Sequence, residues 1–541
     1  MATRYWVTGG TGNYDSTTNW STSSGGVSGA TVPTSADDTI WDANSGAGTV
    51  AINVSSEAKS IDFTNFTGTV DFQDTLAVFG NMTLGAGMTF SNTTGTPLLR
   101  IRAAATLTSN GVAFPYDFSV LASSVTITLA DDWECNNFTH DAGSVNPTFN
   151  GNNFFINGSL SNLNTNRYIT GTTVFVMQGT GSISSLYASL NQYRIVTNLT
   201  INTAGTITFA TNLGGVNGVW TYTAGTVITT GMTLTLRGTF DLDGITFENL
   251  YIFSTTTLLS DLTCTDTIST RTLTGNNVIN VNGATIRHTG ATGGITNSVG
   301  SVGSTGGLQG TTVLSFEGSG SLNTGGSQGV IKLPITINTA GTYTPSSIFS
   351  INGSTFTYTS GTVDFSSSQL DIRQNNQTTT FNGISSLTFN ELLMGQNSAN
   401  VYVVLNDTMN VNTIIAQSST GIGTVINRFS GTHAFVCDEF QVKGGRRQVI
   451  ELQDGLTYTI NNKLWSPYTI VVAPYAKIQS TSSGSKANIN LPFGADQELL
   501  YVQFEDIDAS SGQTLWTFGS LPIITNCDNI NKFTQPKAVG I

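Results

Sequence analysis

The sequence predicts an all-β fold: a parallel β-helix, or β-solenoid, with a small N-terminal cap and a β-rich C-terminal cap domain. Three features of the 541-residue chain predict this fold. Apolar and polar residues alternate in short stretches bounded by Gly, Asn and Asp. Long blocks of sequence recur in the same order. Charged residues make up only 10% of the chain, against about 25% in an average soluble protein.

The alternating stretches are typical of strands. In 125–129 and 232–236, apolar residues occupy every second position, and the turn residues Arg237 and Gly238 follow the second stretch. A period of two is that of a strand with one buried face. The β-branched Thr, Val and Ile side chains favour the same extended backbone. No long amphipathic helix is expected.

The recurring blocks indicate an internal duplication. Two pairs of blocks share the same separation along the chain, namely 199–205 with 335–341 and 221–227 with 357–363. Further short blocks recur in the same order with small changes of separation, which indicates insertions in turns. We therefore predict two related units within the solenoid, at about 149–273 and 274–400.

A repeat of this length corresponds to several solenoid coils duplicated together. Tandem β-sandwiches are the alternative, because they also have a strand every 8–12 residues. Gly and Asn at the turns favour the solenoid, since both tolerate the left-handed backbone of sharp corners. The low charge favours it too, because like charges on stacked coils would lie about 4.8 Å apart. Residues 45–430 would then form roughly 15–19 coils.

Both ends differ from the middle in composition. The first 44 residues hold three of the seven Trp, so 1–44 is predicted to be a compact cap or anchor. From Arg428 onward the chain holds nine of its 20 Lys and Arg, so 431–541 is predicted to be a separate β-rich cap domain. Caps are expected because an open solenoid end exposes unpaired backbone groups.

The composition argues against several classes of partner. With 20 basic and 33 acidic residues the net charge is −13, which disfavours binding to nucleic acid and to anionic lipid. The chain has no apolar run long enough to cross a bilayer, so no membrane insertion is expected. Its first residues lack the apolar stretch of a secretory signal peptide. The four Cys and three His are scattered, so no disulfide framework, metal site or cofactor is expected.

Two sets of motifs stand at the ends of the chain. The N-terminal set comprises Arg4-Tyr-Trp-Val7, Gly9-Gly-Thr-Gly-Asn13, Thr18-Asn-Trp20 and Pro33-Thr-Ser-Ala-Asp-Asp38. The C-terminal set comprises Ser482-x-Gly484-Ser485-Lys486 and Tyr501-x4-Asp506-x-Asp508-Ala509-Ser510. Both sets resemble segments of Gly/Thr/Asn-rich virion proteins of tailed bacteriophages. The chain departs from that pattern at Asn526-Cys-Asp-Asn-Ile530, where a Gly-Asn-Asn-x-Gly-Trp-like ending is expected.

The resemblance implies a β-helical component of the virion and transfers no catalytic residues. The function expected from it is that of a non-enzymatic structural protein, an exposed fibre or spike that attaches to host-surface glycans. Its partners would be other virion proteins and further copies of itself, with a trimer suspected. Three alternatives remain: a capsid decoration or head-fibre protein, a tailspike depolymerase, and a cellular surface adhesin.

A depolymerase would need two carboxylates about 5–10 Å apart. The candidates form two groups, Asp131, Asp132 and Glu134, and Asp241, Asp243 and Glu248. Asp241 and Asp243 would share a face if both lay on one strand. Asp132 matches Asp261 across the duplication, which indicates a structural turn. We therefore interpret both groups as solvated strand or turn residues, and no catalytic residue is predicted.

The tryptophans of the N-terminal cap are the candidate binding residues. Trp6, Trp20 and Trp41 are predicted to offer a platform on which sugar rings stack, or to anchor the chain. The alternative is that they form a small hydrophobic core for this cap, because indole rings are large apolar groups that fill cores well.

Overall fold

The computed structural model is a β-solenoid of stacked parallel coils with about 19 turns, 60% strand and 2% helix. This confirms the predicted fold class and excludes tandem sandwiches. The chain divides into two compact units, Met1–Ser260 and Asp261–Ile541. The structure describes residues 2–7, 9, 11–141, 146–163, 167–185, 196–214, 218–270, 278–296, 307–323, 331–372, 376–395, 400–418, 424–443, 448–466, 476–519 and 523–533.

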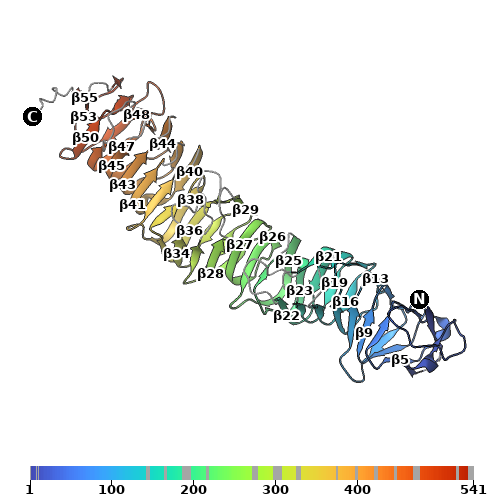
Figure 1. Cartoon of the computed structure of the whole chain (residues 1–541). Coiled ribbons are helices and arrows are strands. Elements are labelled where there is room, and N and C mark those ends of the chain that lie inside the picture. Colours follow the sequence, from blue (N-terminus) through green and yellow to red (C-terminus); the bar gives the residue numbers. More distant parts are fainter. Residues whose placement is uncertain are drawn as a thin grey trace, which may run out of the picture. The chain divides into compact units, whose positions relative to one another are not determined.

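One ladder of parallel strands runs through the first unit (Figure 1). Its successive strands are β4 (Asp38–Ile40), β7 (Ser60–Asp62), β10 (Met82–Thr83), β13 (Ala105–Thr108), β15 (Thr126–Leu129), β18 (Thr148–Gly151), β21 (Ile169–Met177), β23 (Val196–Phe209), β25 (Gly218–Ile228), β26 (Thr233–Asp241) and β27 (Thr246–Leu258).

Other ladders complete the coils of this unit. They comprise β6 (Ser56–Ala58), β9 (Thr75–Val78), β12 (Leu98–Ile101), β14 (Asp117–Val120), β17 (Phe138–His140), β20 (Leu160–Asn162) and β22 (Gly181–Ser185), then β2 (Gly12–Asn13), β5 (Thr49–Ile52), β8 (Thr69–Phe72) and β11 (Thr89–Ser91), and finally β16 (Trp133–Cys135) with β19 (Phe154–Ile156). Inward side chains of these strands fill the coil interior.

Two long ladders run through the second unit, beside shorter ones. One comprises β28 (Leu262–Thr270), β30 (Ile286–His288), β33 (Leu314–Phe316), β36 (Ile335–Pro345), β38 (Thr355–Val363), β40 (Gln377–Asn382), β42 (Val401–Leu405), β44 (Val425–Gly431), β46 (Gln448–Leu452), β48 (Lys477–Ser480), β51 (Gln503–Glu505) and β54 (Ile524–Thr525). The other comprises β37 (Ile348–Ser350), β39 (Gln369–Ile372), β41 (Thr388–Met394), β43 (Met409–Gln417), β45 (Phe435–Lys443), β47 (Thr457–Trp465), β50 (Asp496–Leu500), β53 (Leu515–Phe518) and β55 (Ile530–Phe533).

Helix is confined to single 3₁₀ turns in the described part of the chain. These are η1 (Thr17–Asn19), η2 (Ala43–Ser45) and η4 (Ile384–Ser386). The expectation that no long amphipathic helix forms is therefore met over these ranges.

The interior of the first unit is a column of stacked rings. Phe154 is fully buried, and its ring centroid lies 5.1–5.9 Å from those of Phe118, Phe138, Phe149 and Phe175. Phe175 is paired with Phe154 on the next coil, and Phe138 is likewise paired with Phe118. Inward rings therefore pack against equivalent rings on adjacent coils as well as against rings of their own coil. Burial of such large rings is the main favourable term that holds neighbouring coils together.

The predicted duplication is visible in the strand register. In β23 and β25, Leu199 pairs with Trp220, and the register shifts at Asn202. In β36 and β38, Ile335 pairs with Phe356, and the register shifts at Asn338. The recurring blocks therefore occupy equivalent coils and share the same irregularity.

The N-terminal end has a strand pairing of its own. β1 (Thr3–Trp6) pairs antiparallel with β3 (Trp20–Ser21) and parallel with β4. The head predicted at 1–44 thus contains an antiparallel pair and also extends the first ladder by one strand.

The boundary predicted at residue 430 does not interrupt the ladders. β44 spans this position, pairs with β46, and is followed by further parallel strands as far as Phe533. This corrects the prediction of a separate cap domain at 431–541, since its strands continue the coils. The extra charges are accommodated because cations face acids on neighbouring coils, as in Arg428–Glu451 and Lys477–Glu505.

Candidate functional site

The three tryptophans of the N-terminal head lie inside it. Trp6 and Trp20 are 0% exposed and Trp41 is 1% exposed. The Trp20 centroid lies 5.3 Å from that of Trp6 and 5.2 Å from that of Trp41, and Trp20 Nε1 donates to the Tyr14 carbonyl at 2.7 Å. No ring face is open to a sugar. The predicted stacking platform is therefore wrong, and the alternative of a hydrophobic core describes what these residues form.

The first group of candidate carboxylates is occupied in holding coils together. Asp131 accepts from the backbone N–H groups of Ser109 and Asn110, both at 2.7 Å. Asp132 accepts from Asn153 N at 3.0 Å. Glu134 Oε1 accepts from the Asn157 side chain at 2.6 Å. These carboxylates accept hydrogen bonds from donors of adjacent coils.

The second group is not assembled either. β26 ends at Asp241, so Asp243 lies in the following turn and does not share a strand face with it. Glu248 Oε2 accepts from the backbone N–H of Gly231 at 2.5 Å. The expected same-face geometry of Asp241 and Asp243 is thus wrong, because the strand ends before the alternation reaches Asp243.

The acid that recurs across the duplication has one structural role in both places. Asp132 Oδ1 accepts from Asn153 N, and Asp261 Oδ1 accepts from Thr285 N at 2.8 Å. Each bond joins one coil to the next. This confirms the interpretation of the recurring acid as a structural position.

The buried histidine of the second unit is held by structural hydrogen bonds. His288 Nε2 lies 2.7 Å from the Asp266 carbonyl, which can only accept, so Nε2 carries the proton. Nδ1 then accepts from the Tyr343 hydroxyl at 2.6 Å. Burial lowers the pKa of His288 and raises that of Tyr343. The imidazole is therefore neutral and fixed in the interior.

The thiols carry no reactive signature. Cys135, Cys264 and Cys437 are buried and Cys527 is half-buried. Burial raises the pKa of Cys135 and Cys437 well above that of an ordinary thiol. Thiolates are the nucleophilic form, so these residues act as packing groups. In the described ranges, no three His, Cys, Asp or Glu side chains are grouped as metal ligands.

His140 is expected to make the first unit sensitive to acid. Its side chain is 1% exposed, and burial lowers its pKa from 6.5 to about 4. Between these values the unfolded chain binds the proton more readily, so stability is lost as the pH falls from 6.5 towards 4. The loss should reach about 3 kcal/mol. We expect acid-induced opening of β17, measured by hydrogen exchange, to be weaker in His140→Gln. Equal pH dependence in both proteins would contradict this expectation.

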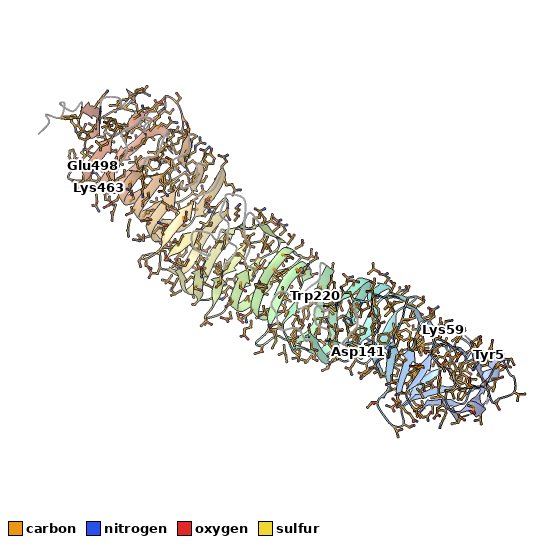
Figure 2. The ribbon with its side chains drawn as sticks, in the orientation of Figure 1. Tyr5, Lys59, Asp141, Trp220, Lys463 and Glu498 are labelled. Carbon is orange, nitrogen blue, oxygen red and sulfur yellow. The ribbon has the colours of Figure 1, made fainter. Side chains whose placement is uncertain are left out.

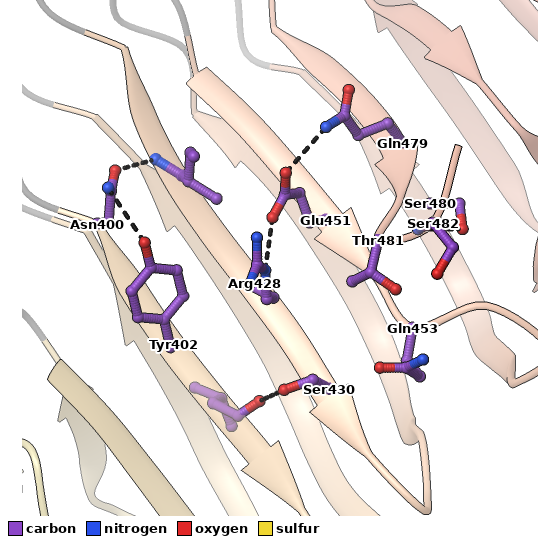
Figure 3. Close-up of polar contacts among 12 residues, drawn as sticks. Asn400, Tyr402, Arg428, Ser430, Glu451, Gln453, Gln479, Ser480, Thr481 and Ser482 are labelled. Carbon is purple, nitrogen blue, oxygen red and sulfur yellow. Dashed lines mark hydrogen bonds and ion pairs between the residues drawn. The ribbon is translucent and has the colours of Figure 1, made fainter. Parts of the chain in front are cut away.

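A polar ladder crosses four coils on the outer face of the second unit (Figure 3). Tyr402, Arg428, Glu451 and Gln479 occupy paired positions on β42, β44, β46 and β48. The Arg428 guanidinium carbon lies 5.1 Å from the Tyr402 ring centroid, and Arg428 Nε donates to Glu451 Oε2 at 2.6 Å. Gln479 Nε2 donates to Glu451 Oε1 at 2.9 Å. Each polar group is used by a neighbouring coil.

The ends of this ladder are bonded in the same way. Asn400 donates to the Tyr402 hydroxyl at 3.3 Å and accepts from Ile426 N at 2.8 Å. At the nearby corner, Asp454 accepts from the hydroxyls of Ser482 at 2.9 Å and Thr481 at 3.2 Å. These bonds lower the pKa of Asp454, and the bond from Ser482 has the largest effect. The side chains of this ladder bond stacked coils to one another, and the ladder contains no acid–base pair that is left unbonded.

Glu451 accepts hydrogen bonds from side chains on both neighbouring coils, Arg428 on one and Gln479 on the other. Glu451→Gln removes the charge that Arg428 faces while keeping the shape, so a destabilisation of about 1 kcal/mol is expected for this pair, in which Arg428 is 39% and Glu451 9% exposed. The measurement is the change in hydrogen exchange of β44 and β46. Asp528→Asn is the matched control, because the Asp528–Lys486 pair is more exposed and should contribute less. A larger effect at Asp528 would contradict this account.

Sequence reasoning missed one set of surface residues. Trp465, Trp516 and Phe533 lie on outer positions of the last coils, and Trp516 and Phe533 are 37% and 45% exposed. The signal was present in Leu515-Trp-Thr-Phe518, where alternation puts Trp516 and Phe518 on the face opposite the buried Leu515 and Thr517. The pairing that brings Trp465 to the same face is not readable from the sequence.

No family model matches the chain, and neither a curated protein nor a solved structure is significantly similar to it. Among the residues that the structure describes, no helix has the length and hydropathy needed to span a bilayer.

Proposed function

We propose that the chain is a non-enzymatic structural protein of a tailed-phage virion, exposed as a fibre or spike that attaches to host-surface glycans. The observation that carries the proposal is that polar side chains at the candidate sites form hydrogen bonds between coils. Carboxylates at the candidate sites and in the polar ladder bond adjacent coils, as Asp131, Asp132 and Glu451 do. The chain is thus equipped as a scaffold, which agrees with the motifs at its two ends.

The outer faces also support attachment to glycans. Neutral hydroxyl groups are laddered between coils, as in Thr148–Thr170 at 3.0 Å and Ser184–Ser161 at 3.1 Å. Such columns present regularly spaced hydrogen-bonding groups without charge. They suit a hydroxyl-rich partner.

The N- and C-terminal motifs of the resemblance have structural places in the described coils. Trp6 and Trp20 build the N-terminal core, and Asp506 accepts from Gly484 N at 2.9 Å between the last coils. The proposal therefore assigns the two motif sets to the ends of the ladders, where a virion protein is held or displayed.

The test is localisation on purified particles. Immunogold labelling with antibodies against this chain should decorate tail fibres or spikes, and particles lacking the chain should adsorb poorly to host cells. Labelling of the head would instead make it a capsid decoration protein. Absence from purified particles would overturn the virion proposal and would favour a cellular adhesin.

A second measurement tests the non-enzymatic part of the proposal. Incubation with host polysaccharide should release no reducing ends above background. Release that disappears in Asp132→Asn or Asp241→Asn would make the chain a depolymerase. Light scattering on the purified protein gives its oligomeric state, for which a trimer is expected.

A further inference from the structure

Exposed aromatic side chains gather near the end of the second unit. Among the residues that the structure describes, the exposed aromatics are Phe493, Trp516 and Phe533, at 88%, 37% and 45%. The ring centroids of Trp516 and Phe533 lie 6.4 Å apart, and those of Phe518 and Phe533 lie 5.5 Å apart. Elsewhere the largest rings fill the interior. Concentrated apolar exposure of this kind marks an interaction surface.

The strand register places two tryptophans in one outward column. Trp465 on β47 pairs with Glu498 on β50. Leu499 pairs with Thr517, so Glu498 is followed on the next coil by Trp516. The neighbours Leu464, Leu499 and Leu515 are fully buried, which leaves the three column residues on the outside. The two indoles are thus two strand spacings apart, about 9.6 Å.

Charged groups of both signs flank this column. Figure 2 labels Lys463 and Glu498 on neighbouring strands of this face. Lys463 Nζ lies 4.5 Å from the Trp465 ring centroid, and Lys463 pairs with the exposed Asp496 on the next strand. The column therefore combines the exposed indole of Trp516, the half-buried indole of Trp465 with the Lys463 ammonium over its ring, and a carboxylate between the two.

We propose that Trp465, Glu498 and Trp516 form a binding stripe for an extended, neutral polysaccharide. Apolar faces of sugar rings stack on indoles, and carboxylates accept hydrogen bonds from sugar hydroxyls. The spacing of the two indoles is close to the length of one disaccharide unit. The polymer would lie along the stacking direction of the coils, with Glu498 bonded to a hydroxyl between the two stacked rings.

Two features select a neutral polysaccharide over other partners. The net charge of −13 and the acids Asp496 and Glu498 disfavour a polyanionic chain. A symmetric contact with a second copy would bring two Glu498 carboxylates together at its centre, whereas the cores of protein interfaces are depleted of charged residues. This inference rests on the proposed attachment function and names its ligand class and its residues.

The test is binding of the full-length protein to immobilised neutral and acidic bacterial polysaccharides, including neutral polysaccharide extracted from the host. Trp465→Ala and Trp516→Ala should each weaken binding to a neutral polymer by about tenfold. Glu498→Gln should weaken it less. Phe493→Ala is the matched control, since this exposed ring lies on a turn outside the column, and its affinity should stay within about twofold of wild type. Circular dichroism verifies folding.

Retention of wild-type affinity by Trp465→Ala and Trp516→Ala would overturn the stripe, as would a preference for acidic polymers. A change of oligomeric state in Trp516→Ala, without a change in polysaccharide binding, would also overturn it in favour of contact between copies. These outcomes are separate from failure of the proposed function, which is read from the particles. A chain that is present on virions but binds no neutral polysaccharide refutes the stripe alone.

Discussion

Phe154→Ala is expected to destabilise the coils around it by about 3–5 kcal/mol. The ring is fully buried and contacts four other phenylalanines from its own and neighbouring coils. Its removal leaves a cavity that the stacked backbones cannot close. Because each coil of a solenoid contacts only its neighbours, the loss should be local. Hydrogen exchange should accelerate in β14, β17 and β19 and stay unchanged in β44 and β46.

Phe493→Ala is the control for this substitution, because that ring is 88% exposed. Its effect on exchange should correspond to less than about 0.5 kcal/mol. Uniform acceleration along both units after Phe154→Ala would contradict the stacking of locally cooperative coils, as would a loss no larger than that of the control.

Gly171→Ala is the second substitution with a large expected effect. Gly171 has φ +114°, and a Cβ built on it would lie 1.9 Å from the Phe149 carbonyl oxygen on the preceding coil. It lies within β21, where the register shifts between Ile169 and Val174. Relief of the clash requires separating two stacked backbones, so a loss of about 3 kcal/mol or more is expected. Thermal denaturation and exchange in β18 and β21 measure it.

Gly111→Ala separates backbone strain from the clash between coils. Gly111 has φ +77°, and a Cβ added there would meet nothing within 4 Å. It should therefore show only the cost of a left-handed alanine, about 1–2 kcal/mol. Equal effects at Gly171 and Gly111 would contradict the close approach of the coils at Gly171.

The strands and the duplication were predictable because they depend on local signals. The alternation in 125–129 and 232–236 corresponds to β15 and β26, within a few residues at the ends. The recurring blocks occupy equivalent pairings in β23–β25 and β36–β38. Side-chain alternation and repeat spacing can both be recognised along the sequence itself. Predicting them therefore does not require knowledge of how the coils are paired.

The predictions that failed concerned the environment of single residues and one domain boundary. The three Trp of the head are buried, and the sequence does not say which side of a ring is covered. Asp243 lies just beyond the end of its strand, a difference within the precision of strand ends read from sequence. The boundary at 430 failed because charge composition changes there while the ladder does not, since opposite charges pair between coils.

The aromatic column escaped prediction for a related reason. Trp465, Glu498 and Trp516 meet only through the register between coils, and coil lengths vary along this chain. No spacing in the sequence identifies them as neighbours. Residues that share an outer face of a solenoid are found once the pairing of each strand is known.

The central claim is that successive coils stack in register, and spin-label distances test it most directly. Thr378, Tyr402, Arg428, Glu451, Gln479 and Glu505 occupy successive paired positions. Each labelled protein would carry Glu505→Cys together with one second substitution, Arg428→Cys, Tyr402→Cys or Thr378→Cys. All would be made in a Cys527→Ser background. The expected distances rise evenly to about 14, 19 and 24 Å. Distances that do not increase by one strand spacing per coil would contradict the stacking.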